Sequence, residues 1–328
     1  MSTDPLLSIC IPTYNRLYYL RELLGSILPQ AEVAGVEICV SDNHSEDGTG
    51  RFVEDLLKEK ISALRYIRQP ENIGIDRNMN AAISMARGQY IYPIGDDDML
   101  PAGTLLKILT ELKTSCDVLV LAAVHTDSVL KPLRAHLSDV LAGSVINYPD
   151  QAFEALWDKM PFGAFLARRE CFINKHFSRY AGTSHAYTGA VWEALADMSV
   201  KNGTCNVRCM QDATVLLRGA QKTWRHDAAR IMLLEIPMWF DLLCENNTYV
   251  GVASRIRECY MSRQTRYFTL AHYRANSQLR INNVIKITAA CSLSQKLKVV
   301  IVSITPVFGL KVAFYLKRKI DLWRFFEK

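Results

Sequence analysis

The segment Gly95-Asp96-Asp97-Asp98 places three consecutive carboxylates directly after the apolar run 90–94. Like charges this close repel one another unless a cation or a set of hydrogen-bond donors holds them together. Carboxylate oxygens are the ligands that Mg²⁺ and Mn²⁺ prefer, often beside a phosphate group. A second interpretation is an acidic N-terminal cap for the helix expected over 102–113. The segment therefore indicates either a metal-assisted sugar-nucleotide site or a helix cap.

Three more polar segments carry side chains suited to binding a nucleotide. They are Pro12-Thr13-Tyr14-Asn15-Arg16, Ser41-Asp42-Asn43 with the residues up to Thr49, and the segment 72–80, which precedes a predicted helix. Backbone donors at that helix start, together with Arg77, are suited to a pyrophosphate. Alternatively, Asp42 ends its strand in an ordinary turn, and Arg77 is a solvated helix charge.

The elements that must position these segments are read from the periodicity of apolar residues. Strands are expected at 6–12, 36–40, 64–67, 89–94 and 117–122, and helices at 18–28, 52–57, 77–86 and 102–113. This alternation predicts an α/β fold with a mostly parallel sheet flanked by helices, whose ligands bind at the carboxyl ends of the strands. Because proline cannot donate to a ladder, Pro93 is expected where its strand leaves the sheet.

Beyond this half, the pattern becomes mixed and then mostly helical. We expect three regions: a nucleotide-sugar-binding half over 1–125, an acceptor-side region over 126–230, and a helical C-terminal region over 231–328.

The composition excludes several classes. With 49% hydrophobic and 22% charged residues the chain is globular, and its net charge of +6 is too small to indicate a nucleic-acid partner. The nine cysteines include no CxxC pair, and no histidines have metal-ligand spacing, so we expect reduced thiols, no zinc site and a cytoplasmic location. The N-terminus has no secretory signal pattern.

Four ordered motifs resemble the inverting glycosyltransferases of family 2, which have the GT-A fold. Within that family, the chain is most similar to the O-antigen dideoxyhexosyltransferases, such as the abequosyltransferases. The matching segments are 8–16, 40–49, 72–78 and 86–91 leading into Asp97 and Asp98. The resemblance implies a nucleoside diphosphate sugar donor, a lipid-linked saccharide acceptor in lipopolysaccharide assembly, and a Mg²⁺ or Mn²⁺ ion.

The resemblance also implies roles for single residues. Gly95 replaces the first Asp of the family's D-x-D motif, so Asp96 is expected to take over its ribose contact. Arg218 either closes over the diphosphate or is an ordinary charge at a strand end. The remaining expected contacts are Pro12, Thr13 and Asn15 at the base and ribose with Arg16 nearby, Asp42 with Asn43 at the pyrimidine, Asn72, Gly74 and Arg77 beside the base or phosphates, and Asp97 with Asp98 at the metal.

The catalytic base is less well marked. An inverting transfer needs a group that takes the proton from the acceptor hydroxyl. The family usually supplies an Asp from a Glu-Asp pair, which the corresponding part of this chain lacks. His185 is the first candidate and Glu193 the second, with a helix-cap or packing role for His185 as the alternative.

The C-terminal apolar run 299–310 is too short to span a bilayer, which needs ~20 residues. Lysine, arginine and aromatic side chains surround it. This pattern is typical of a helix lying on an anionic membrane, here the inner face of the cytoplasmic membrane, or of a terminal helix packed on the protein.

Two other functions remain open from the sequence. A degenerate sugar-nucleotide-binding scaffold would account for the missing Asp and the missing Glu-Asp pair. A nucleotidyltransferase on a similar fold would need a glycine-rich basic loop near the N-terminus, and 6–16 contains no glycine.

Overall fold

The computed structural model describes residues 4–31, 36–59, 63–135, 141–219, 227–276, 278–279, 281–289, 291–308 and 310. The chain forms two compact units. The first comprises Met1–Gln221 and Asn246–Tyr249, and the second comprises Lys222–Glu245 and Val250–Lys328.

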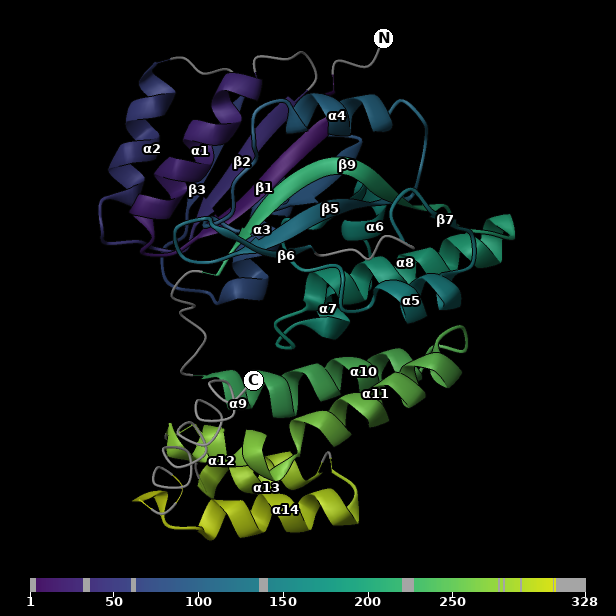
Figure 1. Ribbon diagram of the computed structural model, residues 1–328. Coiled ribbons are helices and arrows are strands. Elements are labelled where there is room, and N and C mark those ends of the chain that lie inside the picture. The colour runs from purple at the N-terminus through teal and green to yellow at the C-terminus, as the bar shows by residue number, and fades with distance from the viewer. Residues whose placement is uncertain are drawn as a thin grey trace, which may run out of the picture. The chain divides into compact units, whose positions relative to one another are not determined.

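The first unit is built on a mixed sheet whose described strands follow the order β3-β2-β1-β4-β8-β5-β9-β7, with β6 paired to β5 (Figure 1). Strands β1 to β4 are parallel to their neighbours, β8 is antiparallel to both β4 and β5, and β9 is parallel to β5. This confirms the predicted mostly parallel sheet. The strands are β1 (Leu7–Thr13), β2 (Val36–Asp42), β3 (Leu64–Arg68), β4 (Tyr90–Pro93), β5 (Val118–Thr126), β6 (Pro132–Ala135), β7 (Val145–Ile146), β8 (Phe165–Arg168) and β9 (Val207–Arg218).

Helices cover both faces of this sheet (Figure 1). Helix α1 buries Leu20, Leu23, Leu24 and Ile27, the residues that set its predicted periodicity. Helices α1, α2 and α4 form the layer on one face of the sheet. Helices α3, α6 and α8 form the layer on the other face. The helices of this unit are α1 (Leu17–Ala31), α2 (Thr49–Lys58), α3 (Ile75–Met85), α4 (Thr104–Glu111), α5 (Pro149–Leu156), α6 (Arg169–Phe172), α7 (Phe177–Tyr180) and α8 (Ala186–Asn202).

The strand order reverses at β1. The chain runs outward from β1 to β2 and β3, and then returns to place β4 on the other side of β1. Such a reversal opens a crevice at the carboxyl ends of the strands, where ligands bind in open α/β sheets. All seven residues of β1 and of β2 are buried, so the loops that follow them start from a rigid base.

Pro93 is the last residue of β4, as expected. Strand β8 pairs with Tyr90 and Ile91 of β4, and next to it the carbonyl of Pro93 accepts the N–H of Gly163 at 2.8 Å, a bond that needs no N–H from the proline. On the other side, the N–H of Ile94 donates to the carbonyl of Cys10 at 3.0 Å. The proline therefore removes no ladder hydrogen bond, and the chain leaves the sheet there.

The second unit is helical, as expected. Its helices are α9 (Ala228–Arg230), followed by a π-helical turn (Ile231–Glu235), α10 (Ile236–Cys244), α11 (Val250–Gln264), α12 (Tyr267–Ala275), α13 (Ile281–Ala289) and α14 (Leu293–Ile304). Among the described helices, none has the length and apolar character needed to cross a bilayer. The basic and aromatic residues after 310 that contributed to the membrane prediction lie outside the described residues.

The nine cysteines are all free, and seven of them are buried. Burial raises the pKa of thiols such as that of Cys116, to about 11, so these side chains are packing groups rather than nucleophiles.

Candidate active site

The three carboxylates after β4 do not cap a helix. Helix α4 begins only at Thr104, and Gly103 occupies its N-cap position without a side-chain hydrogen bond. The carboxylates instead turn back toward the end of β1, where the hydroxyl of Thr13 donates to Asp96 Oδ2 at 2.8 Å. Arg16 Nε lies 3.3 Å from Asp96 Oδ1. The helix-cap interpretation is therefore wrong, and the loops after β1 and β4 form one cluster.

Asp97 is the most exposed of the three. Its Oδ2 lies 2.6 Å from Arg16 Nη2, and about one sixth of each side chain is exposed (16% and 17%). The Arg16 guanidinium also lies over the ring of Tyr19, 5.0 Å from its centroid. The ion pair with Asp97 and the contact with the Tyr19 ring thus hold the Arg16 guanidinium next to the carboxylates.

Asp96 and Asp98 point inward. Burial raises the pKa of Asp96 to about 7, although Arg16 acts in the opposite direction. Asp98 accepts the N–H of Arg218 at 3.1 Å and that of Gly95 at 3.2 Å. Burial, and then the charge of Asp97, raise its pKa well above the usual range. A Cβ on Gly163 would lie 2.6 Å from Asp98 Oδ2, so this position needs glycine.

These placements decide how well the cluster fits a divalent cation. The described residues contain no group of three His, Cys, Asp or Glu side chains arranged to hold a metal ion. Mg²⁺ sites beside a phosphate, however, use only one or two carboxylates and take the other oxygens from substrate and water. Asp97 fits that arrangement, whereas both oxygens of Asp98 accept backbone hydrogen bonds.

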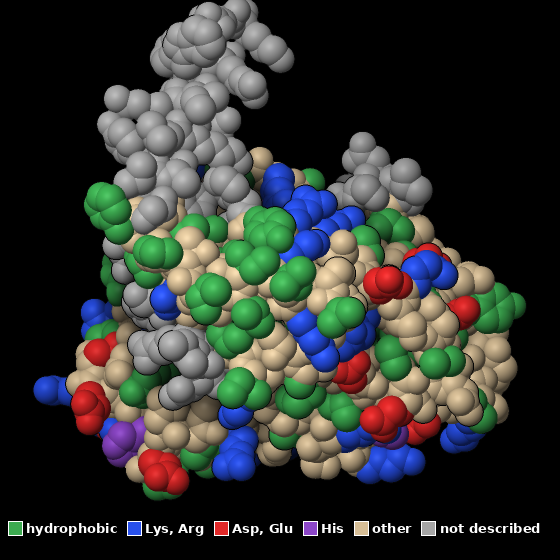
Figure 2. Space-filling view, turned by 90° about the horizontal axis from the view of Figure 1, so that it is seen from below, with side chains coloured by type: hydrophobic (Ala, Val, Ile, Leu, Met, Phe, Trp, Pro, Cys, Tyr) green, Lys and Arg blue, Asp and Glu red, His purple; other side chains and the backbone are tan. Residues whose placement is uncertain are grey.

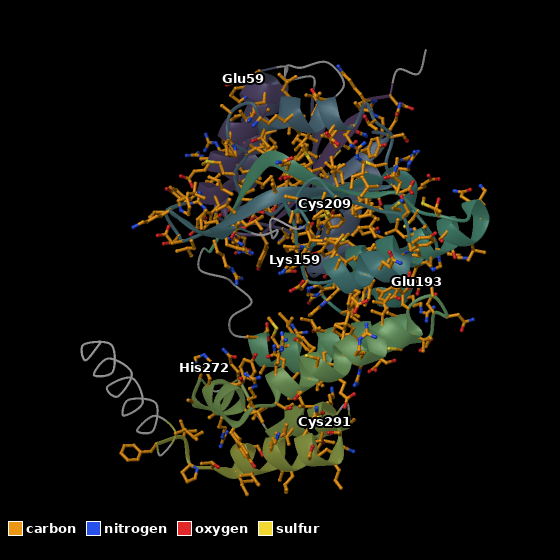
Figure 3. All side chains as sticks on the ribbon, turned by 45° about the vertical axis from the view of Figure 1, so that its right-hand side comes forward. Glu59, Lys159, Glu193, Cys209, His272 and Cys291 are labelled. Carbon is orange, nitrogen blue, oxygen red and sulfur yellow. The ribbon has the colours of Figure 1, made fainter. Side chains whose placement is uncertain are left out.

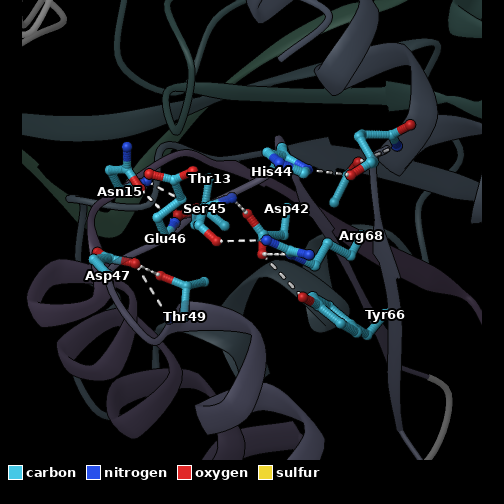
Figure 4. Close-up of polar contacts among 12 residues, drawn as sticks. Thr13, Asn15, Asp42, His44, Ser45, Glu46, Asp47, Thr49, Tyr66 and Arg68 are labelled. Carbon is cyan, nitrogen blue, oxygen red and sulfur yellow. Dashed lines mark hydrogen bonds and ion pairs between the residues drawn. The ribbon is translucent and has the colours of Figure 1, made fainter. Parts of the chain in front are cut away.

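The loop after β2 is organised by Asp42 (Figure 4). Its carboxylate is fully buried and accepts the N–H of Ser45 and the hydroxyl of Tyr66, both at 2.9 Å. Arg68 Nε lies 3.8 Å away. Burial and this carboxylate raise the pKa of Tyr66 above its usual range, so the phenol stays protonated. Asp42 thus fixes the loop that ends β2.

The loop after β1 joins the loop after β2 through Asn15. This residue has a left-handed backbone, with φ of 51°. Its N–H donates to Ser45 Oγ and its side-chain oxygen accepts the N–H of Glu46, both at 2.8 Å (Figure 4). Pro12 and Thr13 are buried at the strand end below it. The two loops are therefore a single rigid platform.

The third loop attaches through two asparagines. Asn43 donates to Asn72 Oδ1 and accepts the N–H of Ile73, both at 2.8 Å. Gly74, with φ of 81°, is the N-cap of α3. Arg77 is exposed in the first turn of this helix. The structure thus brings the start of α3, with its backbone donors, next to the ends of β1 and β2.

Asp76, which the sequence did not single out as a site residue, connects this loop to the acceptor-side region. Its carboxylate accepts the N–H groups of Gly182, Ser184 and Ala186 at 2.9, 3.1 and 3.4 Å. Burial raises its pKa although these three bonds act in the opposite direction. The only sequence signal was its place in the motif 72–78, because its partners lie more than a hundred residues away.

This contact brings His185 to the site. His185 is half-buried at the N-cap position of α8, with Nδ1 3.3 Å from the carbonyl oxygen of Thr183. Its ring stacks with that of Tyr187 at a centroid distance of 6.4 Å. Asp76 therefore holds the segment that carries the first candidate base beside the start of α3.

Glu193, the second candidate base, lies inside the helical layer (Figure 3). It is 2% exposed. Its two oxygens accept from the hydroxyl of Tyr180 and the amide of Asn246, both at 2.6 Å, and Arg179 Nη1 lies 3.5 Å away. These contacts tie α7, α8 and the segment 246–249 together, which is a structural role.

Arg218 supports the carboxylate loop. Its side chain is 3% exposed, and Nη2 forms an ion pair with Glu22 at 2.7 Å. Nε donates to the Asp97 carbonyl at 2.8 Å and Nη1 to the Ser128 carbonyl at 2.9 Å. With all three nitrogens engaged by the protein, Arg218 fixes the position of Asp97 rather than presenting a charge to solvent.

Comparisons with known proteins agree with this geometry. The family model described as glycosyl transferase family 2 matches residues 8–177. The abequosyltransferase RfbV of Salmonella typhimurium is 38% identical over 130 residues, which cover 39% of this chain and 39% of the relative. A Campylobacter jejuni protein named GalNAc(5)-diNAcBac-PP-undecaprenol beta-1,3-glucosyltransferase is 32% identical over 105 residues, 32% of this chain and 34% of the relative. The chain thus aligns with less than half the length of either protein.

Solved structures share the fold. The crystal structure of S. aureus TarS residues 1–349 in complex with UDP-GlcNAc superposes with a TM-score of 0.60 at 15% identity, covering 89% of this chain and 83% of that one. Mannosyltransferase PcManGT from Pyrobaculum calidifontis, in complex with GDP-Man and Mn²⁺, has a TM-score of 0.51 at 16% identity, covering 98% and 84%. With the family model matching more than half of its length, the chain belongs to glycosyl transferase family 2.

Proposed function

We propose that this chain transfers a sugar from a nucleoside diphosphate sugar to a saccharide acceptor carried on a lipid, in the assembly of a surface polysaccharide such as O-antigen. The observation that carries the proposal is the joining of the loops after β1, β2 and β4 where the strand order reverses. A nucleotide sugar needs such a convergence of acceptor and donor groups at one sheet edge. The names of the relatives support the sugar-transfer chemistry and the lipid-linked acceptor.

The donor would lie across the three joined loops. Pro12, Thr13 and Asn15 lie at the base and ribose, with Asp96 beside the ribose. Asp42 and Asn43 shape the pyrimidine pocket. Asn72, Gly74 and Arg77 face the phosphates from the start of α3, where helix N–H groups favour an anion. Arg16 adds a fixed positive charge next to Asp97, and Arg218 holds the Asp97 backbone in place.

Asp97 would hold a Mg²⁺ or Mn²⁺ ion together with the donor diphosphate, with Asp98 behind it. Such an ion neutralises the charge that develops on the departing diphosphate. The Mn²⁺ in the structure of the Pyrobaculum mannosyltransferase supports the choice of metal.

His185 would take the proton from the attacking acceptor hydroxyl, in a transfer that inverts the anomeric carbon. Its support is its place on the 182–186 segment, which Asp76 holds against the start of α3. An imidazole is the side chain that most often serves as a general base in such proton transfers. Glu193, with both oxygens engaged, is left as a structural residue.

The same function organises the whole chain. We assign donor binding to residues 1–125, acceptor binding to 126–230, and attachment at the inner face of the cytoplasmic membrane to the helical region 231–328. A lipid-linked acceptor gives a reason for a membrane-associating segment.

Two measurements on the full chain test the proposal. Thermal shifts with uridine, cytidine, thymidine and guanosine diphosphates, each with and without Mn²⁺, should identify one base that stabilises the fold in a metal-dependent way. Release of that diphosphate from the matching sugar donors should then require a lipid-linked saccharide. Tight binding without turnover on any donor and acceptor pair would overturn transfer and indicate a binding scaffold.

A further inference from the structure

Helix α14 has two apolar faces, of which only one is covered. Val299 and Val302 are buried, together with Gln295 and Ser303. On the other side lie six exposed apolar side chains, which we call the α14 stripe. They are between 40% and 84% exposed, and they are Leu293, Leu297, Val300, Ile301, Ile304 and, just beyond the helix, Phe308.

The spacing makes the stripe continuous. Residues four, seven, eight and eleven positions after Leu293 lie along one side of an α-helix. Isolated apolar groups are common on protein surfaces, but a contiguous row of large ones marks an interaction site. Figure 2 looks from below, the side on which α14 is drawn in Figure 1, and shows hydrophobic side chains at the surface with Lys, Arg, Asp and Glu side chains among them.

The stripe lies on a well-formed helix. Ser292 and Gln295 form a capping box at its N-terminus, which satisfies backbone donors that a frayed helix would leave open. Helices α12 and α13 both contact α14. The exposed row is therefore presented by a fixed element, and its covered face belongs to the core of this unit.

The charge around the stripe indicates the partner. Between Glu258 and Asp321 the sequence has no acidic residue and eleven Lys and Arg residues. The other 28 basic residues are outnumbered by the 33 acidic ones, so the positive charge of the chain comes from this segment. Its described basic residues are Arg263, Arg266, Arg274, Lys286, Lys296 and Lys298.

We propose that the α14 stripe docks this chain on the surface of an anionic phospholipid bilayer. Large aliphatic side chains enter the boundary between headgroups and acyl chains, and the surrounding Lys and Arg residues bind the anionic headgroups. A second copy of the chain fits less well, because each copy would bring the same acid-free basic segment to the contact and the two would repel. The reason why this chain would dock on a membrane rests on the proposed function, namely a lipid-linked acceptor. Vesicle binding is measured without donor or acceptor, so its outcome does not depend on whether the chain transfers a sugar.

The test uses the full chain and sedimentation with vesicles of phosphatidylcholine, with or without 30% phosphatidylglycerol. The wild type should sediment with the anionic vesicles and be released as salt rises. The double variant Leu297→Ser with Ile304→Ser should lose roughly tenfold or more in vesicle affinity, since it removes two exposed aliphatic side chains that would enter the bilayer. The matched control, Val200→Ser with Val250→Ser, changes two exposed valines on α8 and α11 and should leave affinity within about twofold.

A second measurement does not depend on destabilising the helix. Brominated lipid in the anionic vesicles should quench Phe308→Trp more than the wild type, whose five tryptophans give the background signal, whereas Val200→Trp should show no added quenching. Any one of three results would overturn the proposal. The wild type does not sediment with anionic vesicles, the stripe and control variants bind equally, or Phe308→Trp shows no more quenching than the wild type. Conversion of a dimer to a monomer by the stripe variant, with unchanged vesicle binding, would instead identify an interface between copies.

Discussion

Arg16 Nη2 and Asp97 Oδ2 lie 2.6 Å apart where the loops after β1 and β4 meet. The guanidinium neutralises the most exposed carboxylate of the cluster and also lies 3.3 Å from Asp96. A positive charge built into the protein thus occupies part of the space that a divalent cation would share. If Asp97 holds a divalent cation, as proposed, the cation would compete with Arg16 for this carboxylate until the diphosphate of the donor binds to both positive charges.

We expect Arg16→Gln to bind Mn²⁺ more tightly than the wild type in the absence of nucleotide. Removing the competing charge from a partly buried pair should change the affinity about tenfold, which corresponds to ~1.4 kcal/mol. Titration of Mn²⁺ followed by electron paramagnetic resonance measures it. Asp97→Asn is the matched control and should abolish the binding. Equal Mn²⁺ affinity in all three proteins would show that Asp97 is not a ligand.

Two substitutions of Asp42 distinguish its role in holding the loop after β2 from its proposed role in recognising the base. Asp42→Ala removes the acceptor of the Ser45 N–H and the Tyr66 hydroxyl and should lower the free energy of unfolding by about 1–3 kcal/mol. Asp42→Asn can keep a hydrogen bond to each group and should stay close to wild-type stability. Calorimetric titrations of both variants with nucleoside diphosphate and with inorganic pyrophosphate complete the test. If both ligands lose affinity equally, Asp42 does not read the base.

Asp76 should act on catalysis through the segment that carries His185. In Asp76→Ala, three N–H groups of residues 182–186 lose their acceptor, and a base displaced by about 1 Å can lower the rate ~10²-fold. Turnover should fall while the dissociation constant of the donor changes little. His185→Ala should lower turnover by ~10²–10⁴-fold, and the double variant should be no slower than His185→Ala alone. Additive losses in the double variant would show that Asp76 acts independently of His185.

Glu37 should contribute to the pH dependence of stability at the opposite end of the sheet. Burial raises its pKa, but hydrogen bonds from Ser8 and Arg87 hold the pKa below its usual value. The carboxylate therefore stabilises the fold above its unfolded pKa of about 4.3, and this contribution is lost as pH falls through the lower folded pKa. Glu37→Gln should cost about 1–2 kcal/mol at pH 7.

Urea unfolding from pH 7 down to pH 3 measures this prediction. The difference between wild type and Glu37→Gln should shrink as pH falls below about 4. Glu54→Gln, an exposed substitution on α2, should follow the wild type at every pH. A difference that stays constant with pH would mean that the native carboxylate is not the stabilising form.

The first half of the fold could be predicted because its signals are local. The apolar runs of β1 and β2 and the stripe of α1 are patterns within single segments, and polar residues such as Asp42 and Asn43 mark strand ends by their own turn chemistry. Parallel strands joined by helices then bring their carboxyl ends to one edge. Even the position of Pro93 followed from its missing N–H.

The pairing of segments that are far apart in the chain could not be predicted from the sequence. Strand β8 enters between β4 and β5 in the antiparallel direction, and no local pattern shows which neighbours it takes. The carboxylate of Asp76 meets N–H groups at 182–186, and Arg218 reaches Glu22. These contacts depend on the complete sheet and on burial, which makes an unpaired polar group costly and so selects particular partners.

The sequence by itself determined the α/β architecture, the polar loops at the strand ends and the basic, apolar character of the C-terminal segment, because residue type and spacing carry that information. Only the tertiary structure decided which of three consecutive aspartates faces outward, and that Glu193 is tied into a buried network rather than free. For α14, the sequence left a packed helix and a surface helix as alternatives. In the structure α14 is both, because one side of the helix packs on the protein and the other side is exposed.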